Sequence, residues 1–337
     1  MDGPRFDGRF AVAAAIAIVL AGIHPVSSQA IANPADDGRA TIDLVRGHGV
    51  DVGIVGVVRT TADGERLFAW FREIEQLQRG RYIPQIQRFS APPQMLDLAQ
   101  LVLDESELQE LRTCRAGDCE MKLADAEIGR VTAAITSAGG LWRDAAQRAF
   151  REVLLARARA FLEKGLGGTP AYNDRAAPVA AAEDFERLLG GCRLDGLRAD
   201  NVVHYLRRFP SVPDPRVETF LFWSRDLLGD AKPIVGITAV SLFPEGPAGQ
   251  PPMVSAVQVY ASHYITSSFS VTALVPTADR AGRYLVYRRC TRADVFGGMF
   301  GGFIRRAVNR RVRSEGPSLL EWLRRKLEAG PPPRQTR

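Results

Sequence analysis

The sequence has few cysteines and little excess charge of either sign. Its 337 residues include four cysteines, too few for a small scaffold held together mainly by disulfides. The 44 basic residues nearly balance the 38 acidic ones, giving a formal net charge of +6. Because nucleic-acid-binding proteins concentrate a larger basic excess on one face, we predict no nucleic-acid partner. The 46% hydrophobic content is that of an ordinary folded protein with one or two domains.

Motifs that identify common enzymes are also absent. The sequence contains no G-x-S-x-G, no H-E-x-x-H and no P-loop ending in G-K-[ST]. It has no C-x-x-C-H haem motif and no Cys and His spacing typical of a zinc site. We therefore predict no metal and no cofactor, and we favour a binding protein over an enzyme.

The amino-terminal 32 residues resemble a secretory signal peptide in composition. Arg5 and Arg9 precede an apolar run of 14 residues at 10–23, whereas a membrane-spanning helix needs about 20. Small residues favour cleavage after Ala32, with cleavage after Ala30 as the close alternative. The competing interpretation is an uncleaved anchor. No later stretch reaches 18 apolar residues, so we expect a soluble mature protein exported to the periplasm or the extracellular space.

Export places the cysteines in an oxidising compartment, where pairs of cysteines form disulfides. Cys114 and Cys119 are separated by a short segment that contains a glycine and an aspartate, which favour a tight turn. We therefore predict a Cys114–Cys119 disulfide. Cys192 and Cys290 either pair across the fold or stay reduced, and the sequence leaves both alternatives open.

Apolar periodicity divides the mature chain into a helical middle and a β-rich end. We expect a flexible lead-in at 33–48, a strand at 50–60 and a helix at 65–77. A mainly helical section at 91–210 follows, and a disordered tail is expected at 331–337. Five strands are predicted at 218–225, 233–243, 253–264, 267–275 and 283–290.

Short, turn-rich connections between these five strands favour an antiparallel meander. A final helical stretch ends near residue 329, and Gly316 and Pro317 are expected to interrupt it. We therefore predict an α+β fold in which an antiparallel sheet wraps on a C-terminal helix. Residues 49–90 and 211–330 would form this domain, and 91–210 would be a helical insertion or subdomain.

The strand, turn and helix at 50–77 and the run from 218 to 329 resemble the START-like, helix-grip superfamily. The resemblance implies a curved sheet around the last helix and, between them, a space for a lipid or another apolar ligand. The segments CRAGDC at 114–119, ETFLFWS at 218–224 and VYASHY at 259–264 also resemble uncharacterised exported bacterial proteins, and this resemblance implies no activity.

His263 is the best candidate for a catalytic or ligand-binding side chain. Alternation along its strand places it on the more apolar face, where the sheet would meet the helix. It would act there as a base, an acid or a polar anchor. The alternative is a core histidine with a neighbouring hydroxyl or carbonyl as partner. Tyr264, Tyr287 and Arg288 complete the predicted ligand contacts; Arg288 or Arg289 would bind a carboxylate or phosphate, unless both are solvated edge residues.

The final helix carries a basic group formed by Arg305, Arg306, Arg310 and Arg311. These side chains would contact an anionic membrane surface or form a solvated basic face. Our leading hypothesis is an exported protein that binds an apolar or amphipathic small molecule in a cavity between sheet and helix. The alternatives are a cell-envelope enzyme with His263 as general base, and a protein whose basic helix contacts a partner or a membrane.

Overall fold

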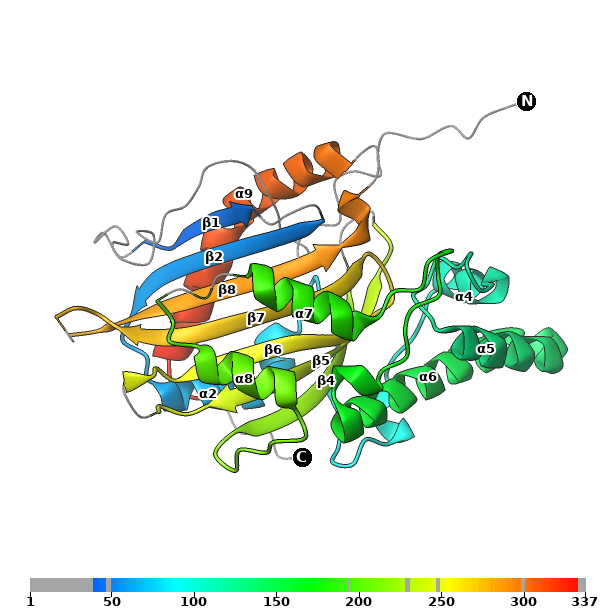
Figure 1. Cartoon of the computed structure of the whole chain (residues 1–337), viewed down its shortest axis with the longest axis horizontal. Coiled ribbons are helices and arrows are strands. Elements are labelled where there is room, and N and C mark those ends of the chain that lie inside the picture. Colours follow the sequence, from blue (N-terminus) through cyan, green and yellow to red (C-terminus); the bar gives the residue numbers. More distant parts are fainter. Residues whose placement is uncertain are drawn as a thin grey trace.

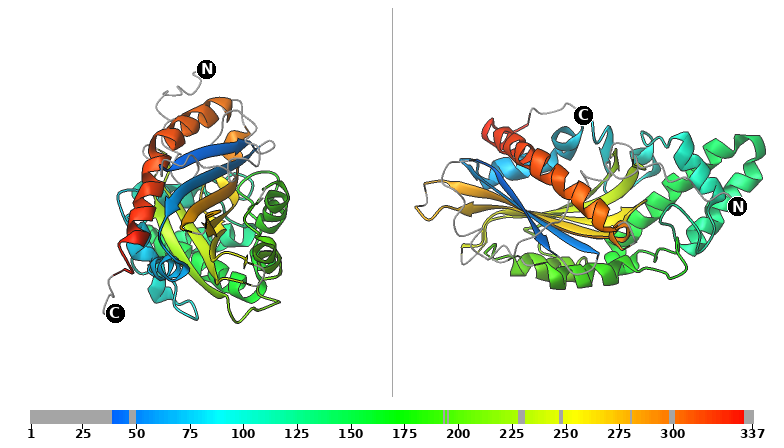
Figure 2. Two further views of the ribbon diagram at one scale, coloured as in Figure 1. Left: turned by 90° about the vertical axis from the view of Figure 1, so that its left-hand side faces the viewer. Right: turned by 90° about the horizontal axis from the view of Figure 1, so that it is seen from above.

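The computed structural model describes residues 39–46, 50–192, 194, 196–227, 231–246, 249–279, 281–297 and 301–332. The predicted signal peptide at 1–32 and the end of the predicted tail, 333–337, lie outside this part of the chain. At its centre is an eight-stranded antiparallel sheet with helices on both faces (Figures 1 and 2). The predicted α+β fold, with a long C-terminal helix and a helical insertion, is confirmed.

The strands follow the order β1-β2-β8-β7-β6-β5-β4-β3 across the sheet. Strands β4 to β8 form the predicted meander, and β2 extends the sheet by pairing with β8. The strands are β1 Thr41–Arg46, β2 Asp51–Thr60, β3 Gln85–Arg88, β4 Glu218–Asp226, β5 Ile234–Phe243, β6 Met253–Ala261, β7 Ile265–Pro276 and β8 Arg283–Ala293.

Strand β1 lies within the segment predicted to be a flexible lead-in, so that prediction is wrong for 41–46. The strand adds to the sheet edge through pairing with β2, from Thr41 opposite Val57 to Arg46 opposite Val52. Leu44 is buried beneath the C-terminal helix in the core shared with Val308. Only two apolar residues, Ile42 and Leu44, alternate in this segment, too short a pattern to identify a strand without its partner.

One face of the sheet carries α2 Gly64–Arg72, α3 Ile74–Gln78 and α9 Gly301–Glu328 (Figure 2). Helix α9 continues through Gly316 and Pro317, where the sequence predicts an interruption. Pro317 removes one helical hydrogen bond. Gly316 lets the helix approach β1 closely, because a Cβ there would collide with Ile42. Packing of α9 on the sheet, through residues such as Leu320, stabilises the continuous helix despite the lost bond.

The helical insertion between β3 and β4 covers the opposite face (Figures 1 and 2). It contributes η1 Met95–Leu98, α4 Glu105–Thr113, α5 Asp125–Ala138, η2 Gly139–Leu141, α6 Trp142–Lys164, η3 Leu166–Gly168, α7 Ala181–Gly191 and α8 Asp200–Arg208, while η5 Asp294–Phe296 follows β8. Phe150 of α6 shares a buried core with Trp223 of β4 and Val259 of β6. The insertion is therefore packed onto the sheet, and each face of the sheet has its own apolar core.

Two disulfides are present in the structure. The predicted Cys114–Cys119 bond closes the turn after α4 and is confirmed. Cys192 and Cys290, which the sequence left undecided, join the end of α7 to β8. Both bonds are compatible with an exported protein. Within the described ranges, no helix is long and apolar enough to cross a membrane.

Candidate functional site

A cavity of about 300 Å³ lies between the sheet and the helices on the α9 side. Its volume is at the lower end of the range for small-molecule pockets. The helical wall is apolar and is formed by Phe71, Leu77, Leu319, Trp322 and Leu323. Leu319 and Trp322 are also 48% and 38% exposed, so these two side chains connect the apolar wall with the protein surface.

The floor of the cavity, formed by the sheet, is rich in polar side chains, which lie beside Phe222, Ile234, Ala256 and Ile265. Because side chains alternate between the two faces of a strand, every second residue of a strand reaches the same space. The polar floor residues are Ser224 and Asp226 of β4, Thr238 of β5, Gln258 of β6, Ser268, Ser270 and Thr272 of β7, and Tyr287 and Arg289 of β8. The cavity is thus amphipathic, with apolar helices facing a hydrogen-bonding sheet.

Arg289 supplies a positive charge to this floor. Its Nε donates to the hydroxyl of Ser268 at 3.1 Å and, at 3.3 Å, to that of Thr291. These bonds fix the direction of the side chain but do not use the two terminal NH2 groups. A guanidinium held in this way keeps planar donors for a carboxylate or phosphate.

Asp226 and Gln258 supply acceptors. Asp226 Oδ1 and Gln258 Oε1 are buried and have no hydrogen-bond partner among the described residues. Burial raises the pKa of Asp226 to about 6, against the opposing effects of a hydrogen bond with Ser224 and the charge of Arg289. Asp226 is therefore mostly ionised at pH 7. Buried acceptors without partners cost about 1 to 3 kcal/mol each, so their place in a cavity points to a missing donor.

Of the predicted ligand contacts, Tyr287 lines this cavity, whereas Arg288, His263 and Tyr264 do not. Arg288 is buried on the other face of β8, on the side where Val286 packs beneath the insertion. Contact of these four predicted residues with a ligand stays a prediction. Arg289, which the sequence offered as the alternative to Arg288, lines the cavity.

The prediction that the more apolar face of β6 meets the C-terminal helix is wrong. Val257 and Val259 pack against the insertion, whereas Gln258 faces the cavity beside α9. The insertion buries the larger apolar core, so the apolar face of the strand turns toward it. Sequence reasoning missed Asp226 and Gln258. The signal that could have found the polar floor is the alternation of Ser268, Ser270 and Thr272 in the middle of an otherwise apolar strand.

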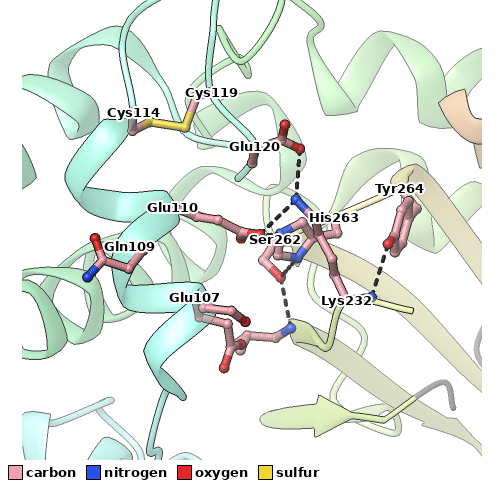
Figure 3. Close-up of polar contacts among 12 residues, drawn as sticks. Glu107, Gln109, Glu110, Cys114, Cys119, Glu120, Lys232, Ser262, His263 and Tyr264 are labelled. Atoms are coloured by element: carbon pink, nitrogen blue, oxygen red, sulfur yellow. Dashed lines mark hydrogen bonds and ion pairs between the residues drawn. A yellow bond between two sulfur atoms is a disulfide. The ribbon is translucent and has the colours of Figure 1, made fainter. Parts of the chain in front are cut away.

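His263 lies in a separate polar cluster at the end of the sheet (Figure 3). Strand β6 ends at Ala261, so His263 stands in the following turn and points toward α4. Its Nε2 is 2.9 Å from Glu110 Oε2, and its Nδ1 is 2.8 Å from the hydroxyl of Ser262. Lys232 Nζ pairs with the other Glu110 oxygen at 2.7 Å. We call these four residues, Glu110, Lys232, Ser262 and His263, the His263 cluster.

Hydrogen bonding fixes the roles within the His263 cluster. The backbone N–H of Val235 donates to Ser262 Oγ at 2.9 Å, which directs the Ser262 hydroxyl hydrogen toward His263 Nδ1. His263 Nε2 then donates to Glu110. Burial raises the pKa of Glu110, but hydrogen bonds from His263 and Lys232 outweigh burial and lower it overall. With His263 only 2% exposed and Ser262 fully buried, the geometry favours a bond between insertion and sheet over a reactive base.

Replacing His263 with Ala should therefore reduce the free energy of unfolding by about 2 to 4 kcal/mol, because Glu110 loses a buried partner and a cavity forms. Urea unfolding measures this change. The matched control is His204→Ala: His204 is exposed on α8, so we expect a change below about 0.5 kcal/mol. A stable His263→Ala variant would contradict the structural role and return His263 to the catalytic candidates.

The predicted basic group on α9 is divided by its surroundings. Arg306 and Arg310 are exposed. Arg305 lies over the ring of Phe296 at 4.8 Å, and Arg311 pairs with Glu315 at 3.0 Å. Contact of this helix with an anionic membrane stays a prediction, now carried mainly by the two exposed arginines.

Comparison of the chain with protein-family models, curated proteins and solved structures gives no match. In the part of the chain that the structure describes, no three His, Cys, Asp or Glu side chains gather as a metal site requires. The amphipathic cavity is therefore the candidate functional site on the strength of its own geometry.

Proposed function

We propose that this protein is exported and binds an apolar or amphipathic, lipid-like small molecule in the cavity between the sheet and α9. The observation that carries the proposal is the cavity itself, about 300 Å³ with an apolar wall and a polar floor. A molecule with one apolar and one polar end would bury its chain against the helices and satisfy acceptors such as Asp226 Oδ1.

The size of the cavity supports a small ligand. An engineered apolar cavity of about 150 Å³ accommodates benzene, so twice that volume holds a short alkyl chain with a polar group. Exposed Leu319 and Trp322 would let a longer chain extend toward the surface.

Organic extraction of the protein purified from a bacterial host, followed by mass spectrometry, tests this proposal. We expect a bound amphiphile in stoichiometric amount. After removal of this ligand, a fluorescent fatty acid should bind at one site and be displaced by other single-chain amphiphiles. The His204→Ala variant, which changes a surface residue far from the cavity wall, should bind equally. Absence of both extractable ligand and binding across a broad lipid panel would refute the proposal.

A further inference from the structure

The cavity floor holds two opposite charges that are not joined to each other. Arg289 lies on β8 and Asp226 on β4, and both line the same space. The charge of Arg289 lowers the pKa of Asp226, but burial outweighs this effect. No ion pair between them occurs among the described residues. A buried charge without a partner is costly, and Asp226 Oδ1 is buried.

The two charges have complementary unfilled hydrogen-bonding capacity. Arg289 uses only Nε toward Ser268 and Thr291, leaving its terminal NH2 groups as donors. Among the described residues, Asp226 Oδ1 is an acceptor without a partner, and Gln258 Oε1 is a second. Gln258 lies on β6, one of the three strands between β4 and β8. A ligand that satisfies all three must offer an anionic acceptor at one point and hydrogen-bond donors at another.

Resting on the proposed function, we infer that the cavity binds a single-chain amphiphile with a zwitterionic head group. Arg289 binds the anionic part, a carboxylate or a phosphate. Asp226 and Gln258 accept hydrogen bonds from the ammonium. The alkyl chain lies against Phe71, Leu77 and Leu323, toward the surface at Trp322. A fatty acid would satisfy Arg289 alone, and an alkylamine would satisfy Asp226 and Gln258 alone.

Calorimetric titration at pH 7.5 with probes built on a ten-carbon chain tests this inference without any variant. The probes are decanol, decanoate, decylamine and two zwitterions, 2-aminodecanoic acid and decylphosphoethanolamine. We expect at least one zwitterion to bind at least tenfold more tightly than decanoate and decylamine. Preference for 2-aminodecanoic acid identifies a carboxylate head, whereas preference for decylphosphoethanolamine identifies a phosphate and a wider spacing of charges.

Two variants separate the contributions of the charges. Arg289→Gln should lower the affinity for the preferred zwitterion and for decanoate at least tenfold and leave the affinity for decylamine unchanged. Asp226→Asn, which keeps the size of the side chain, should lower the affinity for the zwitterion and for decylamine and leave the affinity for decanoate unchanged. The matched controls are Arg283→Gln on the same strand and Asp279→Asn on an exposed turn; both remove the same charges outside the cavity and should bind as the wild type.

The outcomes distinguish this inference from the proposed function. Equal affinity of the wild-type protein for decanol, decanoate, decylamine and both zwitterions would overturn the zwitterion inference while supporting an apolar binding cavity. An equal loss of affinity for every probe in both variants would also overturn the zwitterion inference. Failure of all five probes to bind, decanol included, would instead overturn the proposed function.

Discussion

Replacing Gly236 with Phe should lower the affinity for the fluorescent fatty acid at least 100-fold while leaving the protein folded. Gly236 lies near the start of β5 and lines the cavity. A Cβ built there meets only the carbonyl oxygen of Tyr260, at 3.4 Å, an ordinary contact. The aromatic ring would occupy the space that the ligand needs, and aromatic residues are favoured in strands.

Equilibrium titration and thermal unfolding together test this expectation. Filling a cavity commonly stabilises a protein, so we expect an unchanged or higher melting temperature for Gly236→Phe. The matched control is Gly236→Ala, which adds one methyl group at the same position and should change the affinity less than about threefold. Full binding by a folded Gly236→Phe variant would show that the ligand lies elsewhere.

Glu127→Gln should produce the largest loss of stability, about 3 to 5 kcal/mol, because it leaves a buried cation without its counter-charge. Arg157 of α6 is fully buried, and its Nε and Nη2 donate to the two carboxylate oxygens of Glu127 at 2.8 and 2.7 Å. The guanidinium also lies 5.1 Å from the ring centre of Tyr172 and 4.9 Å from that of Tyr260. Because Tyr260 belongs to β6, this group joins the insertion to the sheet.

An exposed pair of similar geometry provides the control. Arg143 Nε and Nη2 donate to the carboxylate of Glu105 at 2.8 and 2.7 Å, but both side chains are more than half exposed. Water screens this pair, so Glu105→Gln should leave the free energy of unfolding nearly unchanged. Denaturant unfolding of both variants measures the difference. Equal losses in the free energy of unfolding would show that burial does not determine how much the Arg157–Glu127 pair stabilises the protein.

The His263 cluster shows how a suggestive group of side chains can be structural. Serine, histidine and glutamate form a hydrogen-bonded chain, but the serine is completely buried and already accepts a backbone N–H. Glu110, which completes the chain, comes from the insertion and is separated from His263 by 153 positions. No local pattern could have paired them. The sequence suggested His263 as important, and only the packing of α4 against the sheet shows what it contacts.

Sequence periodicity was enough to identify most elements of the fold. The section at 91–210 is mainly helical, as predicted, and the five strands of the meander lie where alternation and turns place them. Cys114 and Cys119 are close in the chain with a turn between them, so their pairing was also accessible. These features depend on neighbours within a few residues, which is the information that a local pattern contains.

The tertiary structure decided which face of each strand lines the cavity. Alternation correctly separates Arg288 from Arg289 and Val257 from Gln258, but it cannot say which set faces the C-terminal helix. That choice depends on the insertion at 91–210, whose apolar core takes one face of the sheet and leaves the polar face to α9. The sequence therefore determined the strands and their alternation, and long-range packing determined where the cavity lies.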